Sequence, residues 1–212
     1  MHTTFTTSDG LHLAAHWDLP VSDPTGAIVL CHPHPLMGGS MDVPLIRGIA
    51  TGLTGLGFAV LRFDFRGVGG SEGAWSGGGA EIEDVAAAVL TADAAYPSLP
   101  HGLAGWSFGA HTALRWQVRS GDGRPYAGIA PPVSMTGAAD LPSPNALPPA
   151  ARLFVIGDRD QFTTVEALRT YASDAGAQLE LVSGSDHFFY FREGRVADLV
   201  AAHFSEAFSE PE

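Results

Sequence analysis

Short apolar runs alternate with helix-like segments along most of this chain, and this alternation constrains the fold more than any other feature. Strands that are buried on both faces are almost continuously apolar, which is typical of a parallel sheet covered by helices on both sides. The apolar runs predict strands at 27–31, 58–63, 102–106, 127–129, 153–156 and 179–182. We therefore expect one α/β domain over residues 1–212, built on a mostly parallel sheet.

Two further strands are expected in a hairpin over residues 3–18, because its Asp9-Gly10 pair favours a tight turn. The complete sheet would then have about eight strands. Apolar residues at helical spacing predict helices at 43–54, 80–95 and 108–119, from about 163, and at the C-terminal end. Thr163 and Glu166 fit a capping box at the start of the fourth helix. The proline-rich stretch 131–150 is expected to be a surface connection.

Composition excludes several classes of function. The net charge of −12 disfavours binding to nucleic acid or to anionic membranes, because both are polyanions. A single cysteine, Cys31, allows no internal disulfide. No apolar stretch approaches the ~20 residues of a membrane helix, and the first residues lack the pattern of a signal peptide. We expect a cytoplasmic protein with a small-molecule substrate; the sequence leaves its oligomeric state open.

The pattern G-x-S-x-G occurs twice, around Ser107 and around Ser71. A nucleophile elbow needs a strand before the serine and a helix after it, with glycines that relieve crowding in the sharp turn. Ser107 has both elements. Ser71 is followed by a glycine-rich stretch that cannot start a stable helix. We therefore predict Ser107 as the nucleophile and interpret Ser71 as a turn residue.

A serine hydroxyl becomes a good nucleophile only when a base takes its proton. Behind such an elbow an acidic residue and then a histidine follow along the chain. Two histidines lie beyond residue 150: His203 falls on the apolar face of a helix, whereas His187 follows the last strand. His187 is the predicted base. Most of the four aromatic residues after it, Phe188 to Phe191, are expected to pack in the core under the last helix. Asp158 and Asp160 both follow the preceding strand, and spacing alone leaves them open as the acid.

Together these residues resemble the α/β-hydrolase superfamily, in which the acid commonly stands in a G-x-x-D turn. That resemblance selects Asp160 over Asp158, and implies a triad of Ser107, Asp160 and His187. The segment His32-Pro33-His34-Pro35, followed by Gly38-Gly39-Ser40, is similar to that of small, lidless predicted serine hydrolases. The resemblance implies the α/β-hydrolase fold with helices on both faces and no cap domain.

An oxyanion hole needs two backbone N–H donors. Phe108, directly after the nucleophile, is one expected donor. The other should come from the loop after Cys31, where the two prolines have no N–H group. Leu36 is the predicted donor, with Met37 and His34 as the next candidates.

These residues predict a serine hydrolase that cleaves small carboxylic esters or related acyl bonds through an acyl-enzyme. No cofactor is expected. No metal is expected either, because His32 and His34 would need a third ligand. His32 is instead interpreted as a brace for the loops behind the oxyanion hole. The alternatives are a thioesterase, a lactonase or a small peptidase with the same triad, or a catalytically inactive ligand-binding member of the fold. A lid is often inserted near residues 130–152, and the shortness of this segment predicts an open site.

Overall fold

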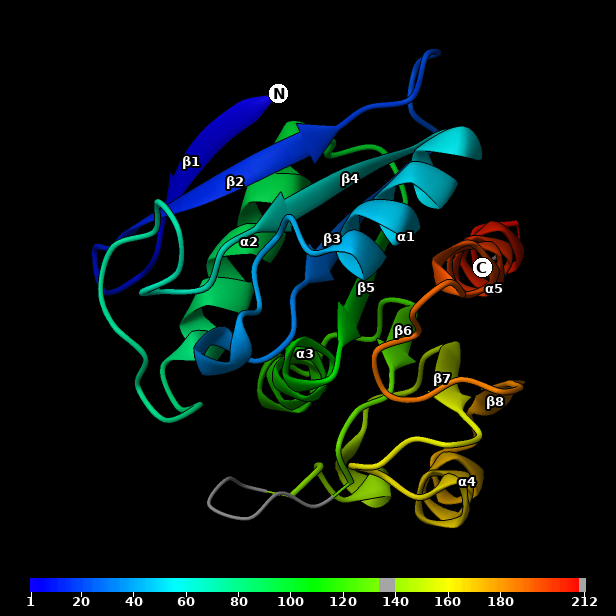
Figure 1. Ribbon diagram of the computed structural model, residues 1–212. Helices are drawn as coiled ribbons and strands as arrows, with labels where there is room; N and C mark the ends of the chain where they lie inside the picture. The colour runs from blue at the N-terminus through cyan, green and yellow to red at the C-terminus, as the bar shows by residue number, and fades with distance from the viewer. Residues whose placement is uncertain (134–139, 210–212) are drawn as a thin grey trace.

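The structure is a computed structural model that describes residues 1–133 and 140–209. An eight-stranded sheet crosses the molecule in the order β1-β2-β4-β3-β5-β6-β7-β8 (Figure 1). The strands are β1 (His2–Thr6), β2 (His12–Asp18), β3 (Gly26–Cys31), β4 (Phe58–Phe63), β5 (His101–Trp106), β6 (Tyr126–Ile129), β7 (Arg152–Gly157) and β8 (Gln178–Val182). β1 and β2 are antiparallel to their neighbours, and β3 to β8 are mutually parallel. The predicted α/β-hydrolase sheet is confirmed.

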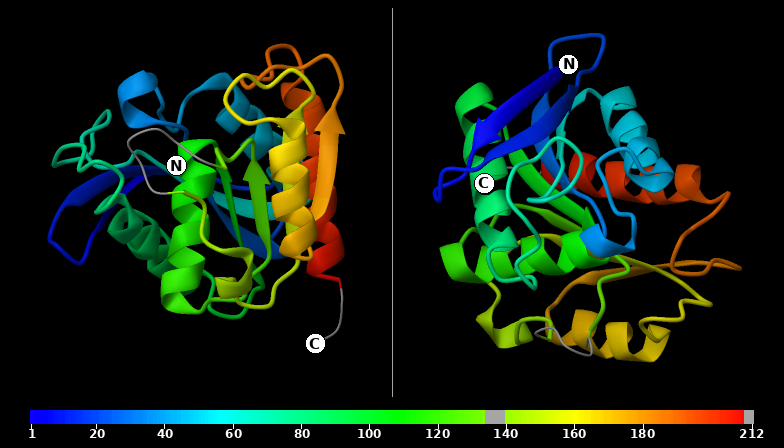
Figure 2. Two further views of the ribbon diagram at one scale, coloured as in Figure 1. Left: turned by 90° about the horizontal axis from the view of Figure 1, so that it is seen from below. Right: turned by 60° about the vertical axis from the view of Figure 1, so that its left-hand side comes forward.

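Helices cover both faces of this sheet. Helices α1 (Pro44–Gly55) and α5 (Glu193–Ala207) lie side by side on one face, as the right-hand view of Figure 2 shows. Helices α2 (Glu81–Ala95), α3 (Phe108–Ser120) and α4 (Val165–Asp174) cover the other face. Two short 3₁₀ turns, η1 (Pro35–Met37) and η2 (Pro144–Ala146), lie in the connections.

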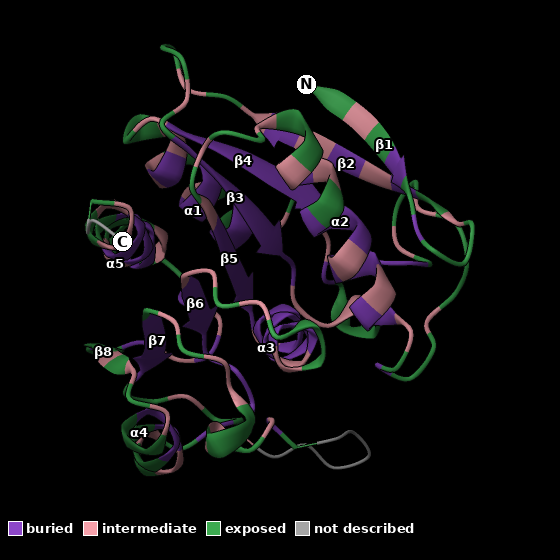
Figure 3. Cartoon of the chain, turned by 180° about the vertical axis from the view of Figure 1, so that it is seen from behind, coloured by how far each residue is buried: buried purple, intermediate pink, exposed green. Residues whose placement is uncertain are grey.

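The core explains why the central strands are continuously apolar. Ile28 and Leu30 of β3 pack under α1 and α5, whereas Val29 and Cys31 face α2 and α3. Figure 3 shows these strands buried and the outer faces of the helices exposed. A fully buried aliphatic side chain contributes roughly 1.5–3 kcal/mol to folding, so both faces are needed to stabilise the sheet.

The start of α4 differs from the sequence prediction by one residue. Thr164 is the N-cap, and its side chain accepts a hydrogen bond from the N–H of Ala167 at 3.2 Å. Thr163 instead bonds across to the connection after β6, where its Oγ1 lies 3.2 Å from the carbonyl oxygen of Pro131. The capping box predicted from Thr163 to Glu166 is therefore wrong, because a long-range contact takes the first threonine.

The connection between β6 and β7 contains η2, and residues 134–139 of it lie outside the described part of the chain. The expectation of a short, lidless connection can thus be compared with the structure only in residues 130–133 and 140–151. These residues add no separate cap domain. Among the helices of the described residues, none is long and apolar enough to span a membrane.

The parallel strands bring distant loops to one edge. The carboxyl ends of β3, β5, β7 and β8 lie at the same edge of the sheet, and each continues into a loop that carries a predicted site residue. Ligands of open parallel sheets bind outside these strand ends.

Candidate active site

Ser107 forms the sharp turn between β5 and α3. Its backbone angles, φ 52° and ψ −117°, lie in a strained region for a residue other than glycine. A Cβ atom at Gly105 would lie 2.5 Å from the backbone nitrogen of Ala110, and one at Gly109 would overlap the carbonyl oxygen of His32. Only glycine therefore fits on either side, as the elbow predicted from the sequence requires.

The structure brings together the three residues predicted as a triad. His187 Nε2 lies 2.9 Å from Ser107 Oγ, and His187 Nδ1 lies 2.8 Å from Asp160 Oδ2. Because an ionised carboxylate can only accept, Nδ1 carries the proton and Nε2 is left to accept from the serine hydroxyl. The histidine is thus oriented as a general base toward Ser107.

Asp160 is itself held in place by the backbone. Its Oδ1 accepts hydrogen bonds from the N–H groups of Phe162 at 2.8 Å and Thr163 at 2.9 Å. Its side chain is fully buried, and that of His187 is 6% exposed. These bonds fix the carboxylate so that Oδ2 faces the imidazole.

Three residues that the sequence analysis does not identify hold His187 from other sides. The backbone N–H of His187 donates to Gln161 Oε1 at 3.3 Å, and Trp106 Nε1 donates to the carbonyl oxygen of His187 at 3.2 Å. The ring of Phe162 meets the imidazole edge to face at 4.7 Å. Gln161 and Phe162 directly follow Asp160 in the chain, and this adjacency is the only sequence signal that could have found them.

Asp158, the other candidate acid, faces away from the triad histidine. Its carboxylate accepts from the N–H of Gly184 at 2.8 Å and from Ser183 Oγ at 3.2 Å. It therefore supports the loop after β8, which carries His187, and Asp160 alone occupies the acid position.

The predicted oxyanion donor Leu36 requires a correction. Its N–H already donates to His34 Nδ1 at 3.2 Å, and its side chain projects to solvent. The N–H of Met37 is also engaged, by the carbonyl oxygen of His34 at 3.0 Å. Among the described residues, no group accepts from the backbone N–H of His34 or of Phe108. The loop thus leaves His34, the remaining candidate, with an available donor.

His32 lies behind this loop and is neutral. Its Nδ1 donates to the carbonyl oxygen of Pro33 at 2.6 Å, and its Nε2 accepts from the N–H of Phe65 at 3.0 Å. Burial lowers the pKa of His32 to about 4. Its interpretation as a brace is confirmed. In residues 1–133 and 140–209, no three His, Cys, Asp or Glu side chains gather as a metal site requires.

A cleft of about 540 Å³ opens above Ser107 and His187. Its remaining walls are mainly apolar and aromatic, and they include Met37, Val43, Pro44, Leu45, Trp106, Pro132, Phe162, Phe188 and Tyr190. Glu193, at the start of α5, also lines it, and no lysine or arginine among the described residues does. This size and lining are typical of a site for a small organic ligand.

The aromatic run after His187 is less buried than the sequence predicts. Phe189 alone is fully buried in the core. Phe188 and Tyr190 stack at 5.6 Å along the cleft, and Phe191 is 91% exposed. The expectation that most of the four residues pack in the core is therefore wrong.

The two residues set aside by the sequence analysis lie away from this cleft. Ser71 Oγ donates to the carbonyl oxygen of Asp64 at 2.6 Å and accepts from the N–H of Ala14 at 2.9 Å, as a turn residue does. His203 is buried on α5, where burial lowers its pKa to about 4. Both interpretations are confirmed.

The eight-stranded sheet and the nucleophile elbow together define an α/β hydrolase. The family model described as serine aminopeptidase, S33, matches residues 22–154, and the chain belongs to this family. A curated relative, the uncharacterized protein RP471 of Rickettsia prowazekii, is 32% identical over 174 residues, which are 78% of this chain and 72% of the relative.

Solved structures agree with this assignment. An alpha-beta serine hydrolase homologue from Coxiella burnetii is 28% identical, with a TM-score of 0.84 over 95% of this chain and 96% of that one. XC6422 from Xanthomonas campestris, described as an α/β serine hydrolase without lid, is 27% identical, with a TM-score of 0.86 over 100% of this chain and 96% of that one. The Pyrococcus furiosus esterase Pf2001 shares the fold at 20% identity and a TM-score of 0.81, over 99% of this chain and 93% of that one.

Proposed function

We propose that this hydrolase cleaves small carboxylic esters through an acyl-enzyme on Ser107. The observation that supports this most strongly is the hydrogen-bonded chain from Asp160 through His187 to Ser107. Ser107 and His187 both line the cleft. A serine so placed is the activated nucleophile of an acyl-transfer enzyme.

In the proposed reaction, Ser107 Oγ attacks the ester carbonyl carbon while His187 Nε2 takes the hydroxyl proton. Asp160 stabilises the resulting imidazolium. The carbonyl oxygen becomes an oxyanion, which accepts hydrogen bonds from the N–H group of Phe108, at the N-terminal end of α3, and from that of His34, in the loop after β3. His34 replaces Leu36 as the proposed second donor.

Collapse of this tetrahedral intermediate expels the alcohol, which takes its proton from His187, and leaves an acyl-enzyme on Ser107. A water molecule then gives a proton to His187 and attacks the acyl carbon. The second collapse releases the carboxylic acid and returns the proton to Ser107. The sequence of steps needs no cofactor and no metal ion.

The cleft favours small, neutral or cation-bearing acyl substrates. Its aromatic and aliphatic walls bind apolar groups, and its volume of about 540 Å³ limits their size. Glu193 would repel a substrate carboxylate, because no lysine or arginine in the described lining of the cleft compensates its charge. The net charge of −12 supports the expectation that neither nucleic acid nor membrane is a partner. We also propose that the activity is cytoplasmic.

Peptide cleavage is the second candidate, because the family model is described as a serine aminopeptidase. The same triad could also serve a thioesterase or a lactonase. The connected triad disfavours an inactive ligand-binding protein, since such a protein needs no base aligned on a serine.

The test is hydrolysis of p-nitrophenyl esters from acetate to octanoate, beside amino-acid p-nitroanilides and an acyl thioester. We expect the highest kcat/KM on short esters, and a loss of about 10³-fold or more in Ser107→Ala. Ser71→Ala, at the second G-x-S-x-G, is the matched control and should keep its kcat. Faster cleavage of anilides or thioesters would replace the ester proposal, and full activity in Ser107→Ala would overturn the mechanism.

A further inference from the structure

Three aromatic rings connect the segments that carry the two proposed oxyanion donors. The centroid of the His34 ring lies 4.7 Å from that of Trp75 and 5.4 Å from that of Phe108. The centroids of the Trp75 and Phe108 rings are 5.1 Å apart. His34 and Phe108 are the residues whose backbone N–H groups are proposed to bind the oxyanion. Trp75 completes the cluster without supplying a donor.

The loop that carries His34 is rigid within itself but weakly attached to the rest of the protein. The N–H groups of Leu36 and Gly39 both bond back to His34, one to its ring and one to its carbonyl oxygen. A Cβ atom at Gly39 would overlap the carbonyl oxygen of Pro33, so the turn is tightly closed. Yet η1 buries none of its three residues. The ring of His34 is therefore the attachment of this loop to the body of the molecule nearest η1, while buried His32 holds its start through the carbonyl oxygen of Pro33.

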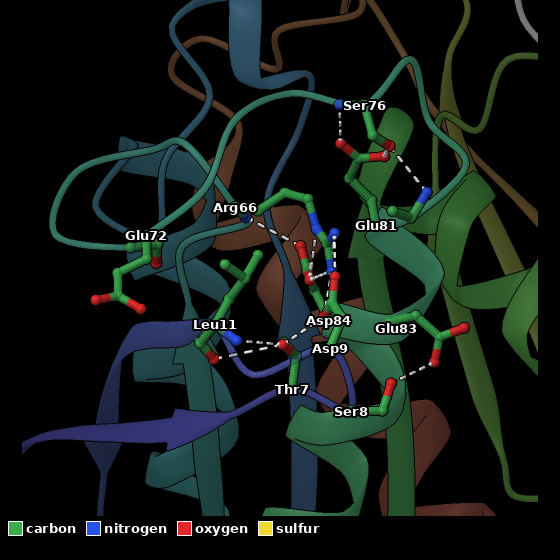
Figure 4. Close-up of polar contacts among 12 residues, drawn as sticks. Thr7, Ser8, Asp9, Leu11, Arg66, Glu72, Ser76, Glu81, Glu83 and Asp84 are labelled. Atoms are coloured by element: carbon green, nitrogen blue, oxygen red, sulfur yellow. Dashed lines mark hydrogen bonds and ion pairs between the residues drawn. The ribbon is translucent and has the colours of Figure 1, made fainter.

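Trp75, by contrast, belongs to a loop with deeply buried anchors. The neighbouring Ser76 donates its N–H and its hydroxyl to the carboxylate of Glu81, at 2.8 and 2.6 Å (Figure 4). At the start of the same loop, Arg66 pairs with Asp84 at 2.6 Å and with Asp9 at 2.8 Å. Arg66 thus fixes the start of this loop by pairing with two acidic residues.

The anchoring acids are unusual in their burial. Glu81 and Asp84 are fully inaccessible to solvent, although both belong to the first turn of α2. Burying a carboxylate costs several kcal/mol unless an ion pair or hydrogen bonds compensate it. Asp84 is paired with Arg66, and Glu81 accepts two hydrogen bonds from Ser76. Such contacts fix the loop at residues 66 and 76, and Trp75 lies next to one of these fixed points.

We propose that Trp75 is a positioning residue of the oxyanion hole, which holds the His34 ring against Phe108 and thereby sets the spacing of the two N–H donors. The inference rests on the proposed function and deepens it. Trp75 is not among the residues that line the cleft, so it acts through His34 and not by contact with the substrate.

This role predicts a specific kinetic effect. An oxyanion forms only in the transition state, so displaced donors lower kcat and kcat/KM together and leave ground-state binding intact. Loss of one complete donor costs about 10²–10³-fold in kcat. A shifted donor should cost less, and we expect Trp75→Ala to lower kcat by about 10- to 100-fold.

The experiment compares Trp75→Ala, Trp75→Phe and Trp116→Leu with wild type, on a short p-nitrophenyl ester and below the unfolding temperature of every variant. Trp116 is buried on α3 against the side chain of Arg124, outside the cleft lining, and is the control for lost packing. Trp75→Phe keeps a ring and should recover most of the kcat. Trp116→Leu should lose thermal stability and keep its kcat.

Hydrogen exchange of residues 33–39 gives a readout that is independent of turnover. We expect faster exchange in Trp75→Ala and unchanged exchange in Trp116→Leu. Unchanged exchange in Trp75→Ala, or a kcat within about twofold of wild type, would overturn the inference. If wild type hydrolyses no ester, the proposed function fails on that result alone, and the exchange still supports or overturns the positioning role of Trp75.

Discussion

Replacing Asp160 with asparagine should invert the hydrogen bonding of the triad. Two backbone N–H groups, from Phe162 and Thr163, point at the Oδ1 position and demand an acceptor there. The amide oxygen of asparagine will take that position. Turning the amide the other way would leave both donors without an acceptor, and for the buried Thr163 this costs roughly 1–3 kcal/mol.

The amide NH₂ must then face His187 Nδ1, which lies 2.8 Å from the present Oδ2. A donor at this position requires Nδ1 to accept, so the imidazole proton moves to Nε2. A protonated Nε2 cannot take the proton of Ser107. The same substitution lowers kcat by about 10⁴-fold in a chymotrypsin-like serine protease, and we expect a loss of about 10³–10⁴-fold here.

The assay is steady-state hydrolysis of p-nitrophenyl acetate near pH 7.5, with circular dichroism to show that each variant is folded. Asp158→Asn is the matched control, because it makes the same chemical change two residues earlier, where the carboxylate bonds only to the loop at Ser183 and Gly184. It should keep its kcat within about tenfold. An Asp160→Asn enzyme that keeps more than a tenth of wild-type kcat would refute the reasoning about the tautomer.

Two other predictions concern the cleft and the core. Wild type should hydrolyse a carboxylate-bearing ester with a lower kcat/KM than its neutral isostere. Glu193→Gln should reduce the ratio of the two kcat/KM values by about fivefold, which corresponds to roughly 1 kcal/mol of charge repulsion. An unchanged ratio would contradict this prediction. Burial lowers the pKa of His203 to about 4 in the folded protein, whereas the unfolded value is near 6.5. Between these two pH values the unfolded chain therefore binds more protons than the folded protein. The free energy of unfolding falls as the pH falls from about 6.5 to about 4. Urea titrations at pH 8 and at pH 5 give the free energy of unfolding of wild type and of His203→Leu. The decrease from pH 8 to pH 5 should be about 2 kcal/mol smaller in the variant than in wild type. Equal decreases would contradict the lowered pKa of His203.

The sequence predicts the framework of the site because local signals there agree with the fold. The apolar run 102–106, the glycines on either side of Ser107 and the following helix all require a sharp elbow. His187 follows from its place after the last strand. The choice of Asp160 over Asp158 as the acid needs the family resemblance as well, because it depends on which of the two carboxylates the turn directs toward His187.

The errors have a common physical cause, which is that loop geometry depends on contacts from distant segments. Leu36 looks like a free donor until the His34 side chain folds back to accept its N–H. The run from Phe188 to Phe191 has no regular period, because Phe189 and Phe191 have positive φ angles of 54° and 62°. Trp75 lies in a glycine-rich loop whose sequence carries no sign of the ring cluster.

The most direct test of the central claim is the intact mass of the protein after treatment with a fluorophosphonate, in wild type and in Ser107→Ala. The account predicts one adduct on wild type, located by peptide mapping to the segment that contains Ser107, and none on the variant. No adduct on wild type, or equal labelling of the variant at another serine such as Ser71, would contradict the assignment of Ser107 as the activated nucleophile.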